Sequence, residues 1–342
     1  MMKFNHSVRK QKGLTITELM VAVAVGLVVS AAVAGLFLQT SSSNKQNNEI
    51  GYIQDNGRYA LKVISDDLEM SNFWAGMSAS DRGSIMVDNV NIAKDGATET
   101  VIASIDDTLN GCSAGTANWN YDFNQPLVYL NNTSKAAAQG IFPCITNAPE
   151  LITGTDVVMI KRTKGLEISA NQVDGRPYIR GNRTVATLHK YQNGSTAAPP
   201  AGFFDWQYLT HIYYIARDCD TCEPKLVRQA LKEDSTPAND PDFATEELAA
   251  GIERFNIQFG IDNNSDGVAD FFTSNPTNIQ ILDAVTAKVF VLARAKNEIR
   301  GYKNTKSYQL GDLAVAAAND GYYRRVFSTT VVMKNTQAVL EM

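Results

Sequence analysis

The 342-residue sequence has only three histidines and four cysteines, and it lacks the short motifs of common enzyme chemistry. It contains no Gly-x-Ser-x-Gly elbow, no glycine-rich phosphate-binding loop and no His-Glu-x-x-His helix. Its histidines, His6, His189 and His211, are scattered along the chain. No catalytic site is predicted, and we do not expect an enzyme.

The sequence also lacks an excess of charge of one sign. Its net charge is −5, with 20% charged and 44% hydrophobic residues, which excludes a global nucleic-acid footprint and favours a folded globular part. One local basic stretch is interpreted as a solvated strand face rather than a DNA contact, so no specific nucleic-acid partner is predicted. It comprises Arg176, Arg180, Arg183 and Lys190, with Tyr178 and Tyr191. The acid pairs Asp66-Asp67 and Glu246-Glu247 are also expected to be solvated.

One long apolar run is present near the N-terminus. From Leu19 to Leu38 every residue is apolar or small, with Ser30 as the one side-chain hydroxyl. At about 1.5 Å per residue this helix would be roughly 30 Å long, the thickness of a bilayer core. The preceding residues 1–12 are polar and basic, so they should stay in the cytoplasm and the chain after Leu38 should lie outside it.

Three interpretations of this segment compete. A plain signal anchor offers no reason for Glu18 at the start of the run. A secretory signal peptide fits the small residues of Ala32-Val33-Ala34, but the run is longer than usual for that class. The third interpretation is a prepilin leader, and it accounts for Glu18.

The stretch Lys12-Gly13-Leu14-Thr15-Ile16-Thr17-Glu18 resembles the class III signal of type IV pilins. The resemblance implies cleavage between Gly13 and Leu14 by a prepilin peptidase, N-methylation of Leu14, and a glutamate at the fifth mature position. An ionised acid in lipid is costly unless it is paired. The resemblance implies that Glu18 pairs with the N-terminal amine of a neighbouring subunit during assembly.

After the apolar run the periodicity indicates a helix continuing to about Met70. Its apolar stripe comprises Ile50, Ile53, Gly57, Ala60, Leu61, Ile64 and Leu68. Beyond it, residues 83–90, 125–130, 156–162, 184–191, 209–216, 225–230, 252–261, 287–294 and 325–333 are predicted strands. The expected fold is therefore α+β and pilin-like, a long helix packed on a mostly antiparallel head with large insertions. The expected division is leader 1–13, membrane half 14–38, amphipathic half 39–72 and head 73–342.

Four cysteines are expected in an oxidising compartment, where disulfides are the default. Cys219 and Cys222 lie between two predicted strands, which favours a local disulfide across a hairpin turn over a redox or zinc site. Cys112 and Cys144 then pair by default, although three connectivities are possible. Their loop of about 30 residues would contribute roughly 3–4 kcal/mol in the chain-entropy model.

A second motif has oxygen-bearing residues at alternate positions. Its proposed ligands are Asp262, Asn264, Asp266, Val268 and Asp270. This spacing is typical of a calcium (Ca2+) loop, with Gly267 allowing the sharp turn, although Thr273 replaces the usual bidentate glutamate. The alternative is an ordinary Asx- and glycine-rich hairpin turn.

The N-terminal signal and the segment from Leu248 to Ala269 together resemble the PilW-type minor pilins. The resemblance implies a role in a priming or tip complex that supports pilus assembly, twitching motility and adhesion. The implied partners are the inner membrane, the prepilin peptidase, other minor pilins, the major pilin and a tip adhesin. The implied location is the inner membrane, with a cytoplasmic N-terminus and a periplasmic head, and then the pilus. The alternatives are a type II secretion pseudopilin and a membrane-anchored periplasmic binding module.

Overall fold

The structure, a computed structural model, describes residues 13–74, 85–86, 93–94, 97–98, 100–101, 125–146, 149–168, 172, 176–182, 186–190, 199–231 and 243–337. The chain forms two compact units, residues 1–50 and residues 51–342. The boundaries expected at residues 13, 38 and 72 stay predictions.

A single helix, α1 (Ile16–Glu69), begins in the first unit and ends in the second. This confirms the helix predicted from Leu14 to about Met70. In the first unit every residue from Leu19 to Leu38 is exposed. The mean hydropathy of one 18-residue window reaches 2.6, so by length and composition the helix can cross a membrane.

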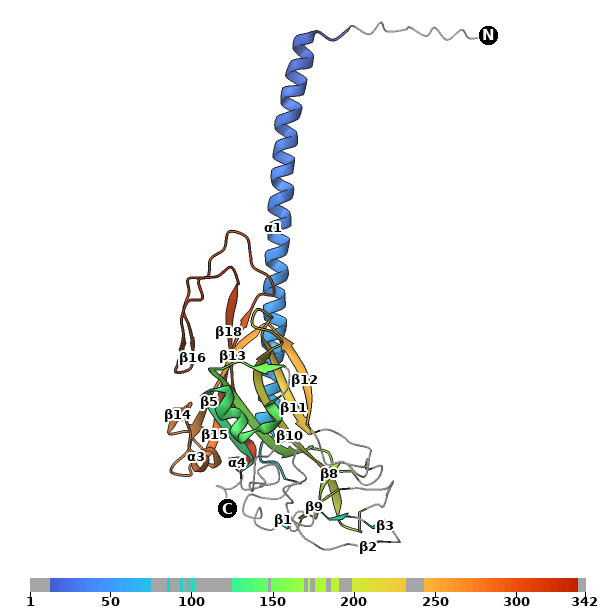
Figure 1. Cartoon of the computed structure of the whole chain (residues 1–342), viewed down its shortest axis with the longest axis vertical. Coiled ribbons are helices and arrows are strands. Elements are labelled where there is room, and N and C mark those ends of the chain that lie inside the picture. Colours follow the sequence, from blue (N-terminus) through green and yellow to red (C-terminus); the bar gives the residue numbers. More distant parts are fainter. Residues whose placement is uncertain are drawn as a thin grey trace, which may run out of the picture. The chain divides into compact units, whose positions relative to one another are not determined.

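The second unit contains a ten-stranded sheet, most of whose strands are labelled in Figure 1. Its central strand β10 (Phe204–Arg217) pairs with β6 (Glu150–Leu151), β7 (Thr155–Thr163), β8 (Pro177–Gly181) and β11 (Lys225–Leu231). The other strands are β1 (Ile85–Met86), β4 (Thr100–Val101), β5 (Leu127–Thr133), β9 (Ala186–Lys190) and β12 (Phe243–Ala250). Among the described pairs of this sheet, β1–β9 is parallel and the rest are antiparallel.

A second, fully antiparallel sheet has the order β14–β13–β15–β18. Its strands are β14 (Phe271–Thr273), β13 (Ile252–Ile261), β15 (Ala284–Arg294) and β18 (Arg324–Val332). Two small ribbons pair β2 (Ala93–Lys94) with β3 (Ala97–Thr98) and β16 (Tyr308–Leu310) with β17 (Leu313–Val315). Short helices are α2 (Lys135–Ile141), the 3-10 helix η4 (Pro143–Thr146), α3 (Asn278–Leu282) and α4 (Lys334–Gln337).

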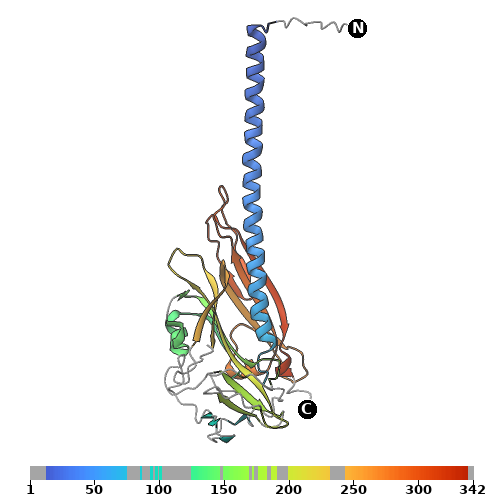
Figure 2. The same ribbon diagram turned by 90° about the vertical axis from the view of Figure 1, so that its right-hand side faces the viewer.

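The main core of the second unit lies where α1 meets both sheets. The buried stripe of α1 comprises Ile53, Gly57, Ala60, Leu61, Ile64 and Leu68. All of them except Gly57 cluster with Tyr129 and Val158 of the first sheet and Phe255 and Val289 of the second. Figure 2 shows this part of α1 running alongside the orange and red strands β13, β15 and β18. The predicted stripe is confirmed except at Ile50, which is 41% exposed.

Most of the predicted strands are confirmed, and the differences have physical reasons. Of the strand predicted at residues 83–90, the structure describes only β1. β12 was not predicted, because its sequence Phe-Ala-Thr-Glu-Glu-Leu-Ala-Ala does not alternate between apolar and polar residues. It pairs with β11 as an antiparallel neighbour, and charged side chains also join the two strands, with Arg228–Glu246 at 2.6 Å and Lys225–Glu247 at 2.5 Å.

The interpretation of the basic stretch as a solvated strand face was wrong at Arg180 and Tyr178, which are buried. The Arg180 side chain is 4% exposed, and its Nε and Nη2 atoms donate to the two Asp205 carboxylate oxygens at 2.8 and 3.0 Å. Tyr178 is also buried. Arg183 and Tyr191 lie outside the described residues, and β8 contributes to the interior of the head.

Candidate functional site

The residues of the predicted cleavage site lie in an exposed segment directly before α1. Gly13 and Leu14 are exposed, with Leu14 at 78%. Glu18 lies in the first turn of α1, where its Oε2 accepts hydrogen bonds from the Thr15 backbone N–H and hydroxyl, each at 2.9 Å. The Glu18 N–H donates to Thr15 Oγ1 at 3.3 Å, which completes a reciprocal capping box.

The capping box gives Glu18 a second role that the sequence analysis missed. The signal was present, because Thr15-Ile16-Thr17-Glu18 has the Thr-x-x-Glu spacing of a helix N-terminus. A helix start leaves backbone N–H groups without intrahelical partners, and Thr15 and Glu18 satisfy two of them. Glu18 therefore helps to cap the N-terminus of α1 and also carries the negative charge that is predicted to serve assembly.

A buried charge cluster of the second unit surrounds Asp67 on α1. Its Oδ1 accepts from Arg162 Nη2 at 2.6 Å, and its Oδ2 lies 2.5 Å from His211 Nδ1 and accepts from the Tyr213 hydroxyl. Burial alone would raise the pKa of Asp67, but His211, Arg162 and Tyr213 together hold it far below its usual range. The expectation that Asp67 is solvated was wrong, whereas its neighbour Asp66 is 59% exposed.

The Asp67 cluster anchors α1 rather than forming a reaction site. Asp67, His211 and Tyr213 are 3%, 8% and 0% exposed, so a substrate has no access to them. Their hydrogen bonds instead join α1 to β7 and β10, strands that lie far from it in the sequence.

A second buried acid, Asp156 on β7, links the two sheets. It accepts from the Tyr129 hydroxyl, from the Asn132 backbone N–H at 2.8 Å and from Asn256 Nδ2 at 3.1 Å. Burial raises the pKa of Asp156 to about 6, and these donors lower it only in part. Because Asn256 lies on β13 and Asp156 on β7, this hydrogen-bond network holds the two sheets against each other.

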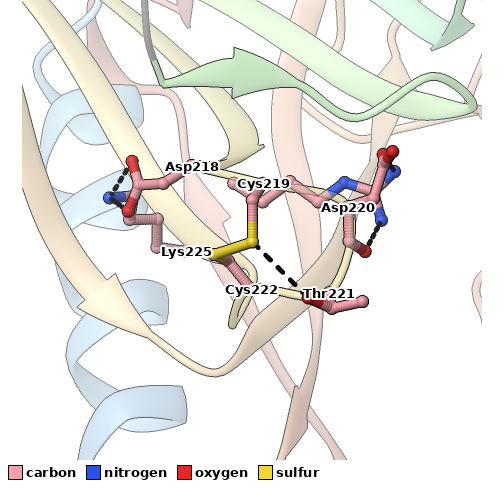
Figure 3. Close-up of a disulfide and its surroundings, with 7 residues drawn as sticks. Asp218, Cys219, Asp220, Thr221, Cys222 and Lys225 are labelled. Carbon is pink, nitrogen blue, oxygen red and sulfur yellow. Dashed lines mark hydrogen bonds and ion pairs between the residues drawn. A yellow bond between two sulfur atoms is a disulfide. The ribbon is translucent and has the colours of Figure 1, made fainter.

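The disulfide Cys219–Cys222 closes the turn between β10 and β11, as predicted, with its Cα atoms 4.9 Å apart. Figure 3 shows the ion pair of Asp218 with Lys225 on one side of the bridge and Asp220 on the other. Lys225 Nζ lies 2.7 Å from Asp218 and 2.5 Å from Glu247. The bond therefore lies in a hairpin turn stabilised by charges, without the helix N-terminus that activates a redox thiol.

The structure describes one of the two cysteines of the second predicted disulfide. Cys144, on η4, is disulfide-bonded. Cys112 lies outside the described residues, so its pairing with Cys144 stays a prediction.

The predicted calcium loop follows β13 and folds around Asp262. Asp262 Oδ1 accepts from the backbone N–H groups of residues 264, 265 and 266, and its Oδ2 accepts from Gly267 N–H at 2.7 Å. Burial opposes ionisation of Asp262, but these four donors hold its pKa below the usual value. Gly267 has a φ of +82°, as the sharp turn requires.

The remaining predicted ligands share this turn. Asn264 Nδ2 donates to Asp266 Oδ2 at 3.2 Å and lies 3.5 Å from Asp270 Oδ1, whereas the Val268 N–H donates to Asp266 Oδ1. Across the described part of the chain, no three His, Cys, Asp or Glu side chains are grouped to hold a metal ion. A site here would need amide and backbone oxygens, and calcium binding stays a prediction.

Comparison with known proteins finds similarity in two segments of the chain. Residues 8–34 match the prokaryotic N-terminal methylation motif, and residues 212–335 match the family of type IV pilus-assembly protein W, PilW. A type IV-like pilin from Thermus thermophilus is similar at 13% sequence identity, with a TM-score of 0.28, over 54% of this chain and 80% of that chain. No curated protein matches the chain.

The two family matches confirm the resemblance to PilW-type minor pilins with a prepilin signal. The first match spans Gly13, Leu14 and Glu18, and the second spans the chain from β10 to α4. They support a role in type IV pilus biogenesis, membrane anchoring through α1, and interaction with the prepilin peptidase and other pilins. They also support a structural protein rather than an enzyme.

Proposed function

We propose that this chain, with its prepilin signal and its match to pilus-assembly protein W, is a minor pilin acting in a priming or tip complex. In that role it supports pilus assembly, twitching motility and adhesion. The observation that carries the proposal is the joining of two features in one chain. An exposed Gly13–Leu14 junction precedes an apolar helix with Glu18 in its first turn, and the PilW match covers residues 212–335 of the same chain.

The proposed course begins in the inner membrane, with the N-terminus cytoplasmic and the head periplasmic. The prepilin peptidase cuts after Gly13 and the new amine of Leu14 is methylated. Glu18 then pairs with the N-terminal amine of a neighbouring subunit as the chain enters the complex. The proposed neighbours are other minor pilins, the major pilin and a tip adhesin.

Glu18 variants test this proposal, and the capping box decides which variants are needed. Glu18→Ala removes both the charge and the helix cap, whereas Glu18→Gln keeps an acceptor for the Thr15 N–H and removes the charge alone. We expect both variants, expressed in a deletion strain, to have as few pili and as little twitching as the deletion. Asp55→Asn, at an exposed acid on the same helix, should behave as wild type.

The other outcomes distinguish the alternatives. Normal piliation in Glu18→Gln with loss in Glu18→Ala would mean that Glu18 acts only as a cap, which contradicts the proposed charge pairing. Deletion that abolishes protein secretion and leaves motility intact would identify a type II secretion pseudopilin. Deletion that changes neither would favour an anchored binding module.

A further inference from the structure

A cavity of about 430 Å³ lies in the second unit beside the Cys219–Cys222 turn. Arg217 of β10, Arg254 of β13, Arg294 of β15 and Arg324 of β18 line it. Among the described lining residues, the carboxylates are Asp220 and Glu253. Even with Asp320, which binds Arg324 from outside the lining, four guanidinium groups outnumber the acids around the cavity.

Three of the four arginines are already engaged. Arg324 donates to both Glu253 oxygens at 2.6 and 2.9 Å and to both Asp320 oxygens at 2.6 Å. Arg217 donates to Asp220 Oδ1 at 3.0 Å. Arg254 donates to the Gly154 carbonyl. The acids near the cavity are therefore occupied by Arg324 and Arg217.

Arg294 is paired more weakly than the other three. Its side chain is 14% exposed, and its Nε is buried without a hydrogen-bond acceptor among the described residues. The nearest carboxylate oxygen, Glu253 Oε1, lies 4.0 Å from Nε and already accepts from Arg324. The Arg294 guanidinium carbon lies 4.4 Å from the centre of the Tyr322 ring, so the ring covers one of its faces.

Among the described residues, Nε of this largely buried guanidinium has no hydrogen-bond acceptor, and its nearest carboxylate is 4.0 Å away. Such weak pairing of a buried cation is unfavourable, and an oxyanion in the cavity would supply a closer negative charge. The planar fork of arginine suits a carboxylate, which it can bind through two parallel hydrogen bonds. The cavity is near the lower end of the range for small ligands, so it suits one side chain rather than a folded element. Cys222 lines the cavity, and its disulfide bond to Cys219 restrains this part of the rim.

We infer that this cavity receives a carboxylate side chain, Asp or Glu, from a neighbouring protein subunit, with Arg294 as its main partner. The inference rests on the proposed function, which places other pilin subunits around this one. To the proposed function it adds one specific contact between subunits, in which an acidic side chain of the neighbour enters the cavity beside the disulfide turn.

The test uses the full chain in detergent micelles and a peptide of five glutamates, with a peptide of five glutamines as the neutral control. We expect the glutamate peptide to bind by calorimetry, and Arg294→Gln to weaken it at least tenfold. Arg325→Gln is the matched control, since this exposed neighbour on β18 does not line the cavity. It should keep affinity within twofold of wild type. Equal binding by Arg294→Gln, or by the glutamine peptide, would overturn the inference.

Two further measurements separate the possible failures. Sulfate that displaces the peptide at lower concentration than acetate would identify a site for inorganic oxyanions and contradict the inference. If Arg294→Gln lowers the melting temperature, Arg217→Gln at the rim gives a second measurement and should also weaken the peptide. In cells, Arg294→Gln should reduce piliation. Normal piliation in this variant, alongside loss in Glu18→Gln, would overturn the cavity inference and leave the proposed function standing.

Discussion

Asp67 contacts Arg162, His211 and Tyr213 inside the head, near the end of α1. A carboxylate in such a place is stable only because its partners outweigh the cost of removing it from water. Removing its charge would leave the Arg162 guanidinium, which is 16% exposed, without a counter-charge. The Asp67 charge therefore helps to hold α1 against the sheet.

We expect Asp67→Asn to lower the free energy of unfolding by about 3 kcal/mol, because it leaves the largely buried Arg162 guanidinium without its acid. The matched control is Asp66→Asn at the preceding residue, which is 59% exposed and pairs with Lys62 on the surface. The control should change stability by less than about 0.5 kcal/mol. Urea unfolding followed by circular dichroism measures both, and equal effects would contradict the anchoring role.

The raised pKa of Asp156 predicts that its contribution to stability changes with pH in the opposite direction to that of Asp67. Its folded pKa of about 6 exceeds the roughly 3.9 of an unfolded aspartate, so the folded state binds the proton more tightly. Its contribution is full below about pH 3.9 and is lost as pH rises through 6. Relative to Asp156→Asn, wild type should lose about 2–3 kcal/mol between pH 4 and 7. A constant difference across that range would show that Asp156 does not titrate there.

Asp67 has the depressed pKa, so its contribution is present above the unfolded value and is lost only at strongly acidic pH. The two acids therefore change stability in separate pH ranges and can be measured in one titration.

The calcium loop is tested by metal addition and removal. At 5 mM calcium, a site with a dissociation constant of about 0.5 mM would stabilise the head by about 1.4 kcal/mol. We expect a rise in melting temperature with calcium, reversed by EDTA and absent in Asp266→Asn. No difference between calcium and EDTA would leave the loop as a hairpin turn held by Asp262.

At the scale of elements, α1 and β18 approach closely at Gly57. A Cβ atom added there would lie 2.5 Å from the Phe327 ring, so only glycine fits without movement. We expect Gly57→Ala to destabilise the head by about 1–3 kcal/mol through overpacking.

Gly51 on the same helix is the control, because a Cβ there meets nothing within 4 Å. Gly51→Ala should stabilise by about 0.5–1 kcal/mol through helix propensity. Thermal melting of both variants measures the contrast. A Gly57→Ala variant as stable as Gly51→Ala would mean that Phe327 moves aside without cost.

Elements with one clear period are predictable from sequence, and elements held by distant partners are not. The buried stripe of α1 and the alternation in β13 follow directly from spacings of three to four and of two. Asp67 lies three residues after Ile64, so the same spacing places it on the buried face of α1. By contrast, its partners lie 95 and 144 residues away, and nothing near Asp67 in the sequence indicates which groups would pair with it. Strand β12 is hidden for the same reason, since its glutamates pair with β11 rather than with their own sequence neighbours.

At the scale of the whole molecule, the chain combines two units with opposite surface chemistry. In the first, residues 19–38 present an exposed apolar surface suited to lipid or to other apolar helices. In the second, a buried core supports a cavity lined by arginines. A subunit that moves from a membrane to a protein assembly needs both kinds of surface, which is the role that we propose.

The most direct test of that role is the N-terminus of the protein recovered from membranes, measured by intact mass and N-terminal analysis. The account predicts a chain that begins at Leu14 and carries one N-methyl group. A chain that begins after Ala34, or that keeps Met1, would contradict prepilin processing, and the assembly role of Glu18 would fall with it.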